Sequence, residues 1–310
     1  MKCLIEGRGA RAGRSLAALL LLAVLAGLAA CGGSSQSGPT PTLTIGAGPT
    51  AEERILAQIY AQALRNAGFK VGQVAEGRAV SKDPAKALER GVISAYPGHL
   101  TTAIGGTWIF EEYRGVPADA EEAYEKALTL LGEEGNTAFP PTPFDLTNLV
   151  TGLRSKIAES GVEKVSELEG ISVAGLLGCH EALNCAVGLE DLYGQFLDFF
   201  NNPKTVADLY SDITQGVSEY AMVPSTDGRL YAERSKFATL EEDRHLFPAG
   251  NAIFITSEEL AEELGDDFET AIVDAQKGLT LPVMQRLDAE VQVEKRDPAK
   301  VAAAYLSSNS

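Results

Sequence analysis

Three histidines and one run of Ser, Thr and Asp are the residues of this chain that could do chemistry on a substrate. His99, His180 and His245 stand far apart in the sequence, and none lies in a metal-ligand spacing such as HExxH. The run from Ser225 to Asp227 offers a hydroxyl and a carboxylate, but the glycine pattern of a nucleophile elbow is missing around it. The chain also lacks a Walker loop for phosphates. We therefore expect that the chain is not an enzyme and has no cofactor and no metal site.

Residues 1–30 have the pattern of an export signal. Lys2 and three arginines precede an apolar run from Ser15 to Ala30, which is shorter than the roughly 20 residues that a transmembrane helix needs. The stretch from Leu28 to Gly32 resembles a bacterial lipobox, in which Cys31 takes a diacylglyceryl group and becomes the first residue of the mature chain. The alternative is an ordinary signal peptide with an incidental cysteine. We expect lipidation of Cys31, which would anchor the protein on the extracytoplasmic face of the cell membrane.

The residues after Cys31 form a tether, and the remaining cysteines form a pair. Residues 31–42 are rich in Gly, Ser and Pro and have nothing to bury, which is typical of a flexible linker. Once the signal is removed and Cys31 is lipidated, Cys179 and Cys185 are left in an exported chain, where a disulfide is the default. A redox or metal site with His180 is the weaker alternative, because redox pairs favour two intervening residues and zinc needs more ligands.

Composition excludes two classes of protein. A chain of 310 residues with 45% apolar and 22% charged residues can bury a large core and is not intrinsically disordered. It has 26 Lys and Arg residues against 43 Asp and Glu residues, a formal charge of -17. Such a negative field repels phosphate backbones, so we expect no nucleic-acid partner.

From residue 43 onward, short strand-type runs alternate with helix-type periods. We expect strands at 43–45, 69–74 and 92–96, with a helix from the capping box of Thr50 and Glu53 to Gly68 and another from Asp83 to Gly91. In the second half we expect strands at 171–176 and 220–223 and a helix at 187–199. The alternation predicts an α/β protein with a parallel or mixed sheet covered by helices. A ligand would then bind beyond the carboxyl ends of the strands, at the loops that follow Tyr96 and Val223.

In the order and spacing of its motifs, the chain resembles the substrate-binding proteins of ABC transporters for glycine betaine, choline and other osmoprotectants, the quaternary-amine family. The matching segments cover nearly all of the chain after residue 42: 45–46, 50–64, 68–71, 87–91, 96–97, 143–144, 188–194, 225–228, 240–248, 279–287 and 297–302.

The resemblance implies a type II periplasmic-binding-protein fold, in which two α/β lobes joined by two crossing segments close on a ligand. Lobe one would be residues 43–143 plus 249–310, and lobe two would be residues 144–248. It also implies a monomer that binds a small-molecule solute and delivers it to ABC permease subunits with an ATPase. The alternatives are a lipid-anchored module that presents a ligand to a sensor, or an importer subunit for another polar solute such as an amino acid or polyol.

The resemblance weakens at the positions that would hold a betaine. A quaternary ammonium group is held by a cage of aromatic rings, and a betaine also needs a cation for its carboxylate. Where the family commonly has a lysine or arginine, this chain has Gly48 and Ala182. Where the family commonly has aromatic residues, it has the residues His99, Asn148, Pro224 and Gly250. We therefore expect a diverged ligand site and weak affinity for glycine betaine.

Six residues are our candidates for solute binding: Thr50, His99, Thr102, Asn148, Ser225 and Thr226. Thr102 matches a hydroxyl donor of the family, and Ser225 and Thr226 lie in a strand-end loop that lines the cleft in the family. Three of the six have an alternative role: Thr50 as a helix cap, His99 as a solvated loop residue, and Asn148 as a partner of nearby backbone.

Overall fold

A computed structural model of the chain describes residues 41–104, 117–168, 173–176, 179, 185–194, 197–198 and 203–309. The strands are β1 (Ala95–His99), β2 (Asn136–Ala138), β3 (Asn148–Leu153), β4 (Val173–Ala174), β5 (Leu197–Asp198), β6 (Tyr220–Pro224), β7 (Phe237–Thr239) and β8 (Ala252–Ser257). The α-helices are α2 (Ala51–Asn66), α3 (Arg78–Ser81), α4 (Pro84–Glu89), α5 (Leu100–Ala103), α7 (Ala120–Glu133), α8 (Arg154–Ser160), α9 (Ala186–Gly188), α10 (Val206–Gln215), α11 (Gly228–Ala232), α12 (Glu258–Leu264), α13 (Asp266–Gln276), α14 (Leu281–Gln292) and α15 (Pro298–Ser308). A 3-10 turn, η1 (Val165–Glu167), and a π-helical turn, η3 (Leu189–Tyr193), are also present.

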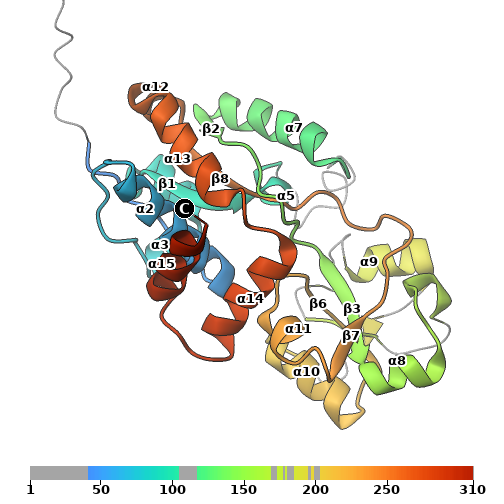
Figure 1. The fold of residues 1–310 in the computed structure, drawn as a ribbon. Coiled ribbons are helices and arrows are strands. Elements are labelled where there is room, and N and C mark those ends of the chain that lie inside the picture. The colour runs from blue at the N-terminus through green and yellow to red at the C-terminus, as the bar shows by residue number, and fades with distance from the viewer. Residues whose placement is uncertain are drawn as a thin grey trace, which may run out of the picture. The chain divides into compact units, whose positions relative to one another are not determined.

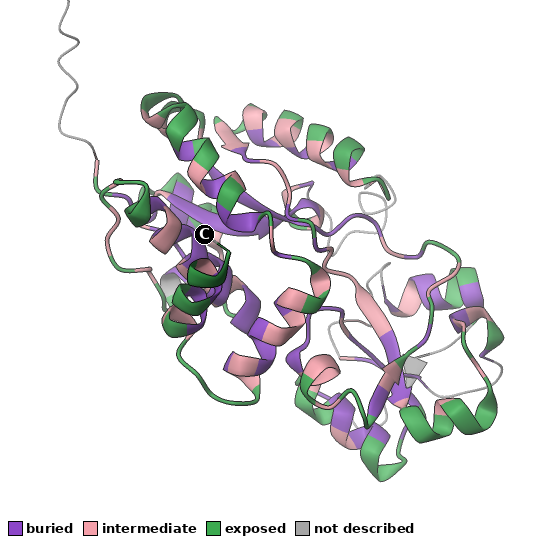
Figure 2. Ribbon diagram, in the orientation of Figure 1, coloured by how far each residue is buried: buried purple, intermediate pink, exposed green. Residues whose placement is uncertain are grey.

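The first sheet has three strands in the order β1-β8-β2, with β8 antiparallel to both neighbours (Figure 1). Successive side chains of a strand point to opposite faces. Phe254 of β8 is accordingly buried against residues of α2, α13 and α15, whereas Ile253 and Ile255 are buried with residues of α4 and α7. Because helices cover both faces, β8 is apolar on both, and Figure 2 shows this strand as buried.

The second sheet has five strands in the order β5-β4-β6-β3-β7 and is mixed. Strand β4 runs parallel to β5 and β6, whereas β3 runs antiparallel to β6 and β7. Within β6, Tyr220 and Met222 belong to one apolar cluster, while Ala221 and Val223 belong to another that includes residues of α10. The α/β class predicted from the sequence is therefore confirmed, with one antiparallel and one mixed sheet.

The chain passes from the first sheet to the second in residues 139–147 and returns in residues 240–251. Hydrogen bonds join the two passages: Asn251 Nδ2 donates to the carbonyl oxygen of Thr142 at 2.9 Å, and Gly250 N donates to Asp145 Oδ1 at 2.6 Å. Burial raises the pKa of Asp145, and this hydrogen bond and the charge of His99 partly oppose the shift. The crossings predicted near 143–144 and 247–248 lie within these passages, while the lobe boundaries themselves stay a prediction.

Local sequence signals place two helices correctly. The capping box of Thr50 and Glu53 begins α2, and Gly68, at a φ of 94°, follows its end. Asp83 caps α4, and Gly91, at a φ of 66°, follows that helix. These glycines have a positive φ that other residues rarely adopt, so each stops its helix as predicted.

Three of the predicted strands differ from the structure. Residues 43–45 and 69–74 form only isolated parallel bridges, which pair Leu43 with Val71 and Ile45 with Ala95. The strand predicted at 92–96 begins at Ala95 and continues to residue 99. This strand begins later than predicted because the residues just after α4 still bond to that helix. Val92 N donates to the carbonyl oxygen of Ala87 at 2.9 Å.

The helix predicted at 187–199 is shorter than expected. Helical turns end at Gly194, which has a φ of 65°, and residues 197–198 pair with β4 as strand β5. The strands predicted at 171–176 and 220–223 are present as β4 and β6, although residues 171–172 lie outside the described residues. No helix in the described part of the chain has both the length and the apolar character needed to cross a membrane.

Candidate functional site

A cavity of about 740 Å³ lies where elements of the two sheets face each other. The start of α2, the end of β1 and α5 contribute residues from the side of the first sheet, and β3, β6 and the loop after β6 contribute from the second. Five of the six predicted solute-binding residues line it, namely Thr50, His99, Thr102, Asn148 and Thr226.

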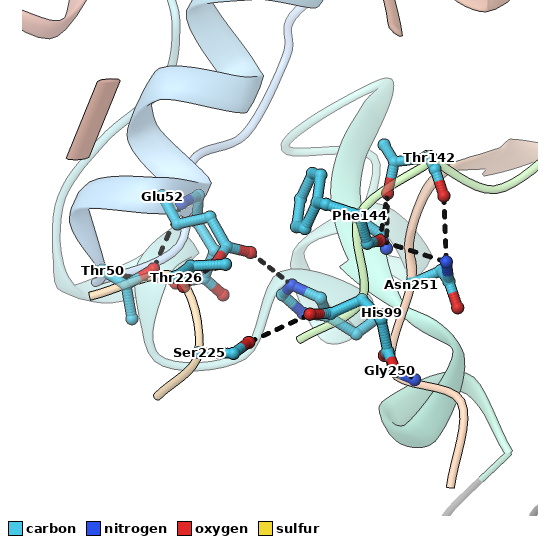
Figure 3. Close-up of polar contacts among 12 residues, drawn as sticks. Thr50, Glu52, His99, Thr142, Phe144, Ser225, Thr226, Gly250 and Asn251 are labelled. Carbon is cyan, nitrogen blue, oxygen red and sulfur yellow. Dashed lines mark hydrogen bonds and ion pairs between the residues drawn. The ribbon is translucent and has the colours of Figure 1, made fainter. Parts of the chain in front are cut away.

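Glu52 joins the two sides of this cavity (Figure 3). Its Oε1 lies 2.7 Å from His99 Nε2 at the end of β1, and its Oε2 accepts a hydrogen bond of 2.6 Å from Thr226 Oγ1 in the loop after β6. Glu52, His99 and Thr226 are 4%, 9% and 3% exposed. Since each carboxylate oxygen has its own partner, Glu52 links a residue that precedes α5 to a residue that precedes α11.

His99 carries a raised pKa because of its acidic surroundings. Burial acts to lower the pKa of the imidazole, but the hydrogen bond and charge of Glu52, with the charges of Glu53 and Asp145, outweigh it and raise the pKa. His99 is therefore buried and paired, and the alternative of a merely solvated loop histidine is wrong.

The hydroxyl of Thr50 is used for capping. Glu53 N donates to Thr50 Oγ1 at 3.1 Å, and Thr50 N and Oγ1 donate to Glu53 Oε2 at 2.9 and 2.7 Å. Thr50 lines the cavity, but its side chain already holds the first turn of α2.

Ser225 and Thr226 are neighbours with different roles. Ser225 Oγ donates to the carbonyl oxygen of Asp145 at 3.0 Å and accepts from Thr147 N at 3.0 Å, so it fixes the passage between the sheets. Ser225 is not among the residues that line the cavity, whereas Thr226 and Asn148 are. Asn148 begins β3 opposite Pro224, at the end of β6.

Two buried carboxylates that the sequence reasoning missed also line the cavity, Asp227 and Asp288. Asp227 caps α11, with Oδ1 accepting from Arg229 N at 3.0 Å, and burial raises its pKa. Burial and the nearby charges of Glu52 and Asp227 raise the pKa of Asp288 well above its ordinary range, although the charge of Arg54 acts to lower it. Asp288 Oδ1 is buried without a hydrogen-bond partner.

Two positions where the family resemblance implied large side chains are glycines with close neighbours. A Cβ on residue 250 would collide with the backbone carbonyl oxygen of Leu146, so Gly250 is required by the local packing. A Cβ on residue 48 would meet the carboxylate of Glu53, the end of a flexible side chain, so a larger residue there would have to displace that capping carboxylate. Among the described residues that line the cavity, Phe247 has the single phenyl ring, and there is no tyrosine or tryptophan.

Other predicted features lie outside the described residues or are partly seen. Cys31, His180 and Ala182 are outside them. The sulfur atoms of Cys179 and Cys185 are in contact, with Cα atoms 5.4 Å apart, a separation that a disulfide accommodates. In the part of the chain that the structure describes, no three His, Cys, Asp or Glu residues are grouped as metal ligands.

Comparisons with known proteins agree in the kind of protein they match. Residues 41–308 match the family model for the substrate-binding domain of ABC-type glycine betaine transport systems. A glycine-betaine-binding protein of Pseudomonas aeruginosa is 25% identical over 301 residues, which cover 89% of this chain and 91% of that protein.

Solved structures show the same fold. A glycine betaine/carnitine/choline ABC transporter structure superposes with a TM-score of 0.70 at 19% identity, covering 86% of this chain and 98% of that one. Apo YehZ from Escherichia coli superposes with a TM-score of 0.67 at 20% identity, covering 86% and 98%. These are likenesses of fold, and they confirm the predicted type II binding-protein architecture.

Proposed function

The chain belongs to the family of substrate-binding domains of ABC-type glycine betaine transport systems, and from this premise we propose that the cavity beside Glu52 is its solute site. The protein is a substrate-binding protein of an osmoprotectant ABC importer. Its solute passes to permease subunits that are driven by an ATPase. The observation that carries the proposal is that one cavity draws its polar side chains from elements of both sheets.

The geometry favours a solute held by hydrogen bonds. His99, Thr102, Asn148 and Thr226 line the cavity, and their side chains can donate or accept hydrogen bonds. The described lining has one phenyl ring and not the set of rings that would enclose a quaternary ammonium group. On these described residues, we infer a site that has diverged from a betaine site.

We assign the cavity to binding and not to catalysis. Glu52 lies between His99 and Thr226, so the imidazole is bonded to a carboxylate and not to the hydroxyl that it would have to activate. The Ser225 hydroxyl is engaged by the passage between the sheets. The Thr226 hydroxyl donates to Glu52 and the Ser225 hydroxyl donates to a backbone carbonyl oxygen, so neither hydroxyl is bonded to the imidazole of His99.

The cellular setting follows from the N-terminus. Lipidation of Cys31 places the domain on the extracytoplasmic face of the membrane, and residues 31–42 give it reach toward a permease. A disulfide between Cys179 and Cys185 suits an exported protein.

Uptake by cells tests the proposal. A strain lacking the gene should lose high-affinity uptake of at least one labelled solute from a panel of betaines, choline, ethanolamine, amino acids and polyols. The same solute should raise the melting temperature of the purified full chain, since binding to the native state alone stabilises it. Unchanged uptake of every solute, with no thermal shift, would contradict the function.

A further inference from the structure

One buried carboxylate at the solute site has an oxygen atom that accepts no hydrogen bond from the described residues. Asp288 lies on α14, lines the cavity and is 1% exposed. Its Oδ1 has no hydrogen-bond partner among the described residues. A buried carboxylate without a partner is costly, so its presence at a ligand cavity indicates that something else supplies the missing donor.

The groups around Asp288 do not satisfy it. Glu52 of α2 and Asp227 of the loop before α11 add like charge. Arg54 of α2 is the nearby cation, but its Nε is itself buried without a hydrogen-bond partner, so the two side chains do not complete each other. The cavity wall thus retains both an unfilled acceptor and an unfilled donor.

The other cationic side chains that line the cavity interact with groups other than Asp288. The guanidinium of Arg229 lies over the ring of Tyr210, 5.1 Å from its centroid, and 3.9 Å from Glu233. Lys295 is exposed, and its Nζ donates to the carbonyl oxygen of Gln292 at 2.6 Å. His99 is already paired with Glu52. The described lining therefore has an excess of buried negative charge on the side of Asp288.

The chemistry of the wall distinguishes two kinds of organic cation. A quaternary ammonium group has charge but no N–H, and it is held by aromatic faces. An ammonium or guanidinium group has both charge and N–H donors, and carboxylates are its strongest partners. The described lining has one phenyl ring and the buried carboxylates of Glu52, Asp227 and Asp288, so it fits an ammonium or guanidinium group better than a quaternary ammonium group.

We propose that the solute is an organic cation with N–H donors on its charged group, such as a primary or secondary ammonium compound, and that Asp288 receives it. Arg54 Nε then donates to an acceptor oxygen or nitrogen elsewhere on the same molecule. This inference rests on the proposed function and specifies the solute class of that site.

Matched probes test the solute class. Titration calorimetry of the full chain in detergent compares ethanolamine with its N-methylated forms up to choline, sarcosine with glycine betaine, and putrescine with its bis-quaternary permethylated form. Each comparison changes the number of N–H donors while keeping the charge. We expect at least one N–H probe to bind at least tenfold more tightly than its fully methylated counterpart.

Two variants test the role of Asp288. The Asp288→Asn variant keeps the shape but removes the charge, and we expect it to weaken binding of the N–H probe at least tenfold without lowering the melting temperature. The Asp274→Asn variant changes an exposed carboxylate of α13, with 58% of its side chain exposed, and should bind as the parent does. A purely structural Asp288 would instead lose stability and affinity together.

The outcomes separate this inference from the function on which it rests. Tighter binding of the fully methylated probes, or unchanged binding in Asp288→Asn, overturns the inference and leaves the importer function standing. Failure of every probe to bind also overturns it. The function fails as well only if the gene deletion leaves uptake of every tested solute unchanged.

Discussion

Glu52 is a charged residue on an otherwise apolar helix face. It lies one turn before Leu56 and two turns before Ile59, which are both fully buried, and it is 4% exposed itself. Its two oxygens hold side chains that are 47 and 174 residues away in sequence. A carboxylate at this position stabilises the fold only if both partners are present, so Glu52 determines the relative placement of His99 and Thr226.

We expect the Glu52→Gln substitution to lower the pKa of His99, because the hydrogen bond and charge of Glu52 are what raise it against burial. An NMR titration of the His99 ring measures this. Glu262→Gln, on exposed α12, is the control and should leave the titration unchanged. An unchanged pKa of His99 in Glu52→Gln would contradict the assigned pairing.

The same pairing predicts a pH dependence of stability. Because the folded pKa of His99 is above the unfolded value of about 6.5, its protonation stabilises the fold fully below about pH 6.5 and this contribution is lost as pH rises through the folded pKa. The difference in free energy of unfolding between the parent and His99→Gln should therefore be largest in mildly acidic solution. Urea denaturation between pH 5 and 9 measures it, and a difference that grows with rising pH would be the wrong sign.

Asp288 should behave in the opposite sense to a paired carboxylate. Its raised pKa means that the unfolded chain loses this proton more readily, so the fold loses stability as pH rises above the ordinary aspartate pKa of about 3.9. We expect Asp288→Asn to be more stable than the parent at neutral pH, by differential scanning fluorimetry without solute. A lower melting temperature than the parent would show that the carboxylate is structurally required.

The sequence indicated some of these residues and not others. Thr102 and Asn148 could be placed at the cavity because their positions match ligand-site positions of the family that the chain resembles. Glu52 was missed, although a charge on an apolar helix face was visible in the sequence. The unfilled state of Asp288 depends on the packing of α14 against distant segments, and no local pattern encodes it.

At the scale of elements, α14 holds the loop after β6. Gly228 N donates to Gln292 Oε1 at 3.3 Å, and Gln285 Nε2 donates to the carbonyl oxygen of Ser225 at 2.7 Å. Residue 228 has no room for a Cβ, which would collide with the backbone of Ala289. Helix α14 and the start of α11 thus approach closely on one side of the cavity.

Gly228→Ala should therefore destabilise the protein by about 1–3 kcal/mol, the cost of forcing an extra methyl group into packed backbone. Gly72→Ala is a suitable control, since its Cβ would meet ordinary contacts, the nearest being the carbonyl oxygen of Leu43 at 3.6 Å. Chemical denaturation compares the two variants. Equal stability of Gly228→Ala and the parent would show that α11 and α14 are not closely packed.

Element boundaries were predictable where caps decide them and not where long-range pairing does. The capping box at Thr50 and the glycine at 91 fixed helix ends through contacts within a few residues. The stretch at 43–45 depends on partners such as Val71 and Ala95, so its strand pattern gave only isolated bridges.

At the scale of the whole molecule, the architecture was more predictable than the site. The order of many weak motifs matched a known family, and the family model covers residues 41–308. The site depends on side chains brought together across two sheets, such as Glu52 and Thr226. Here we propose that the chain departs from its family, so resemblance could place the cavity but could not specify its chemistry.

The anchor can be tested on intact cells. Cys31→Ser should release the protein from the membrane or leave its signal uncleaved, because the thiol that takes the lipid is gone. Fractionation and immunoblotting measure this, with Cys179→Ser and Cys185→Ser in combination as the control that keeps the anchor. Membrane retention equal to the parent, with normal cleavage, would exclude lipidation at Cys31.

We propose that the solute binds in the cavity beside Glu52. The described residues also line a second hollow of about 980 Å³ between α4, the end of α7 and α12, with Asp83, Glu134 and Glu263 among them. Hydrogen exchange of the full chain, with and without the tightest-binding solute, distinguishes the two. If the solute binds beside Glu52, it should slow amide exchange at residues 50–54, 99–102 and 225–228 and leave exchange at residues 83–94 unchanged. Protection confined to residues 83–94 or to other segments would contradict binding in the cavity beside Glu52.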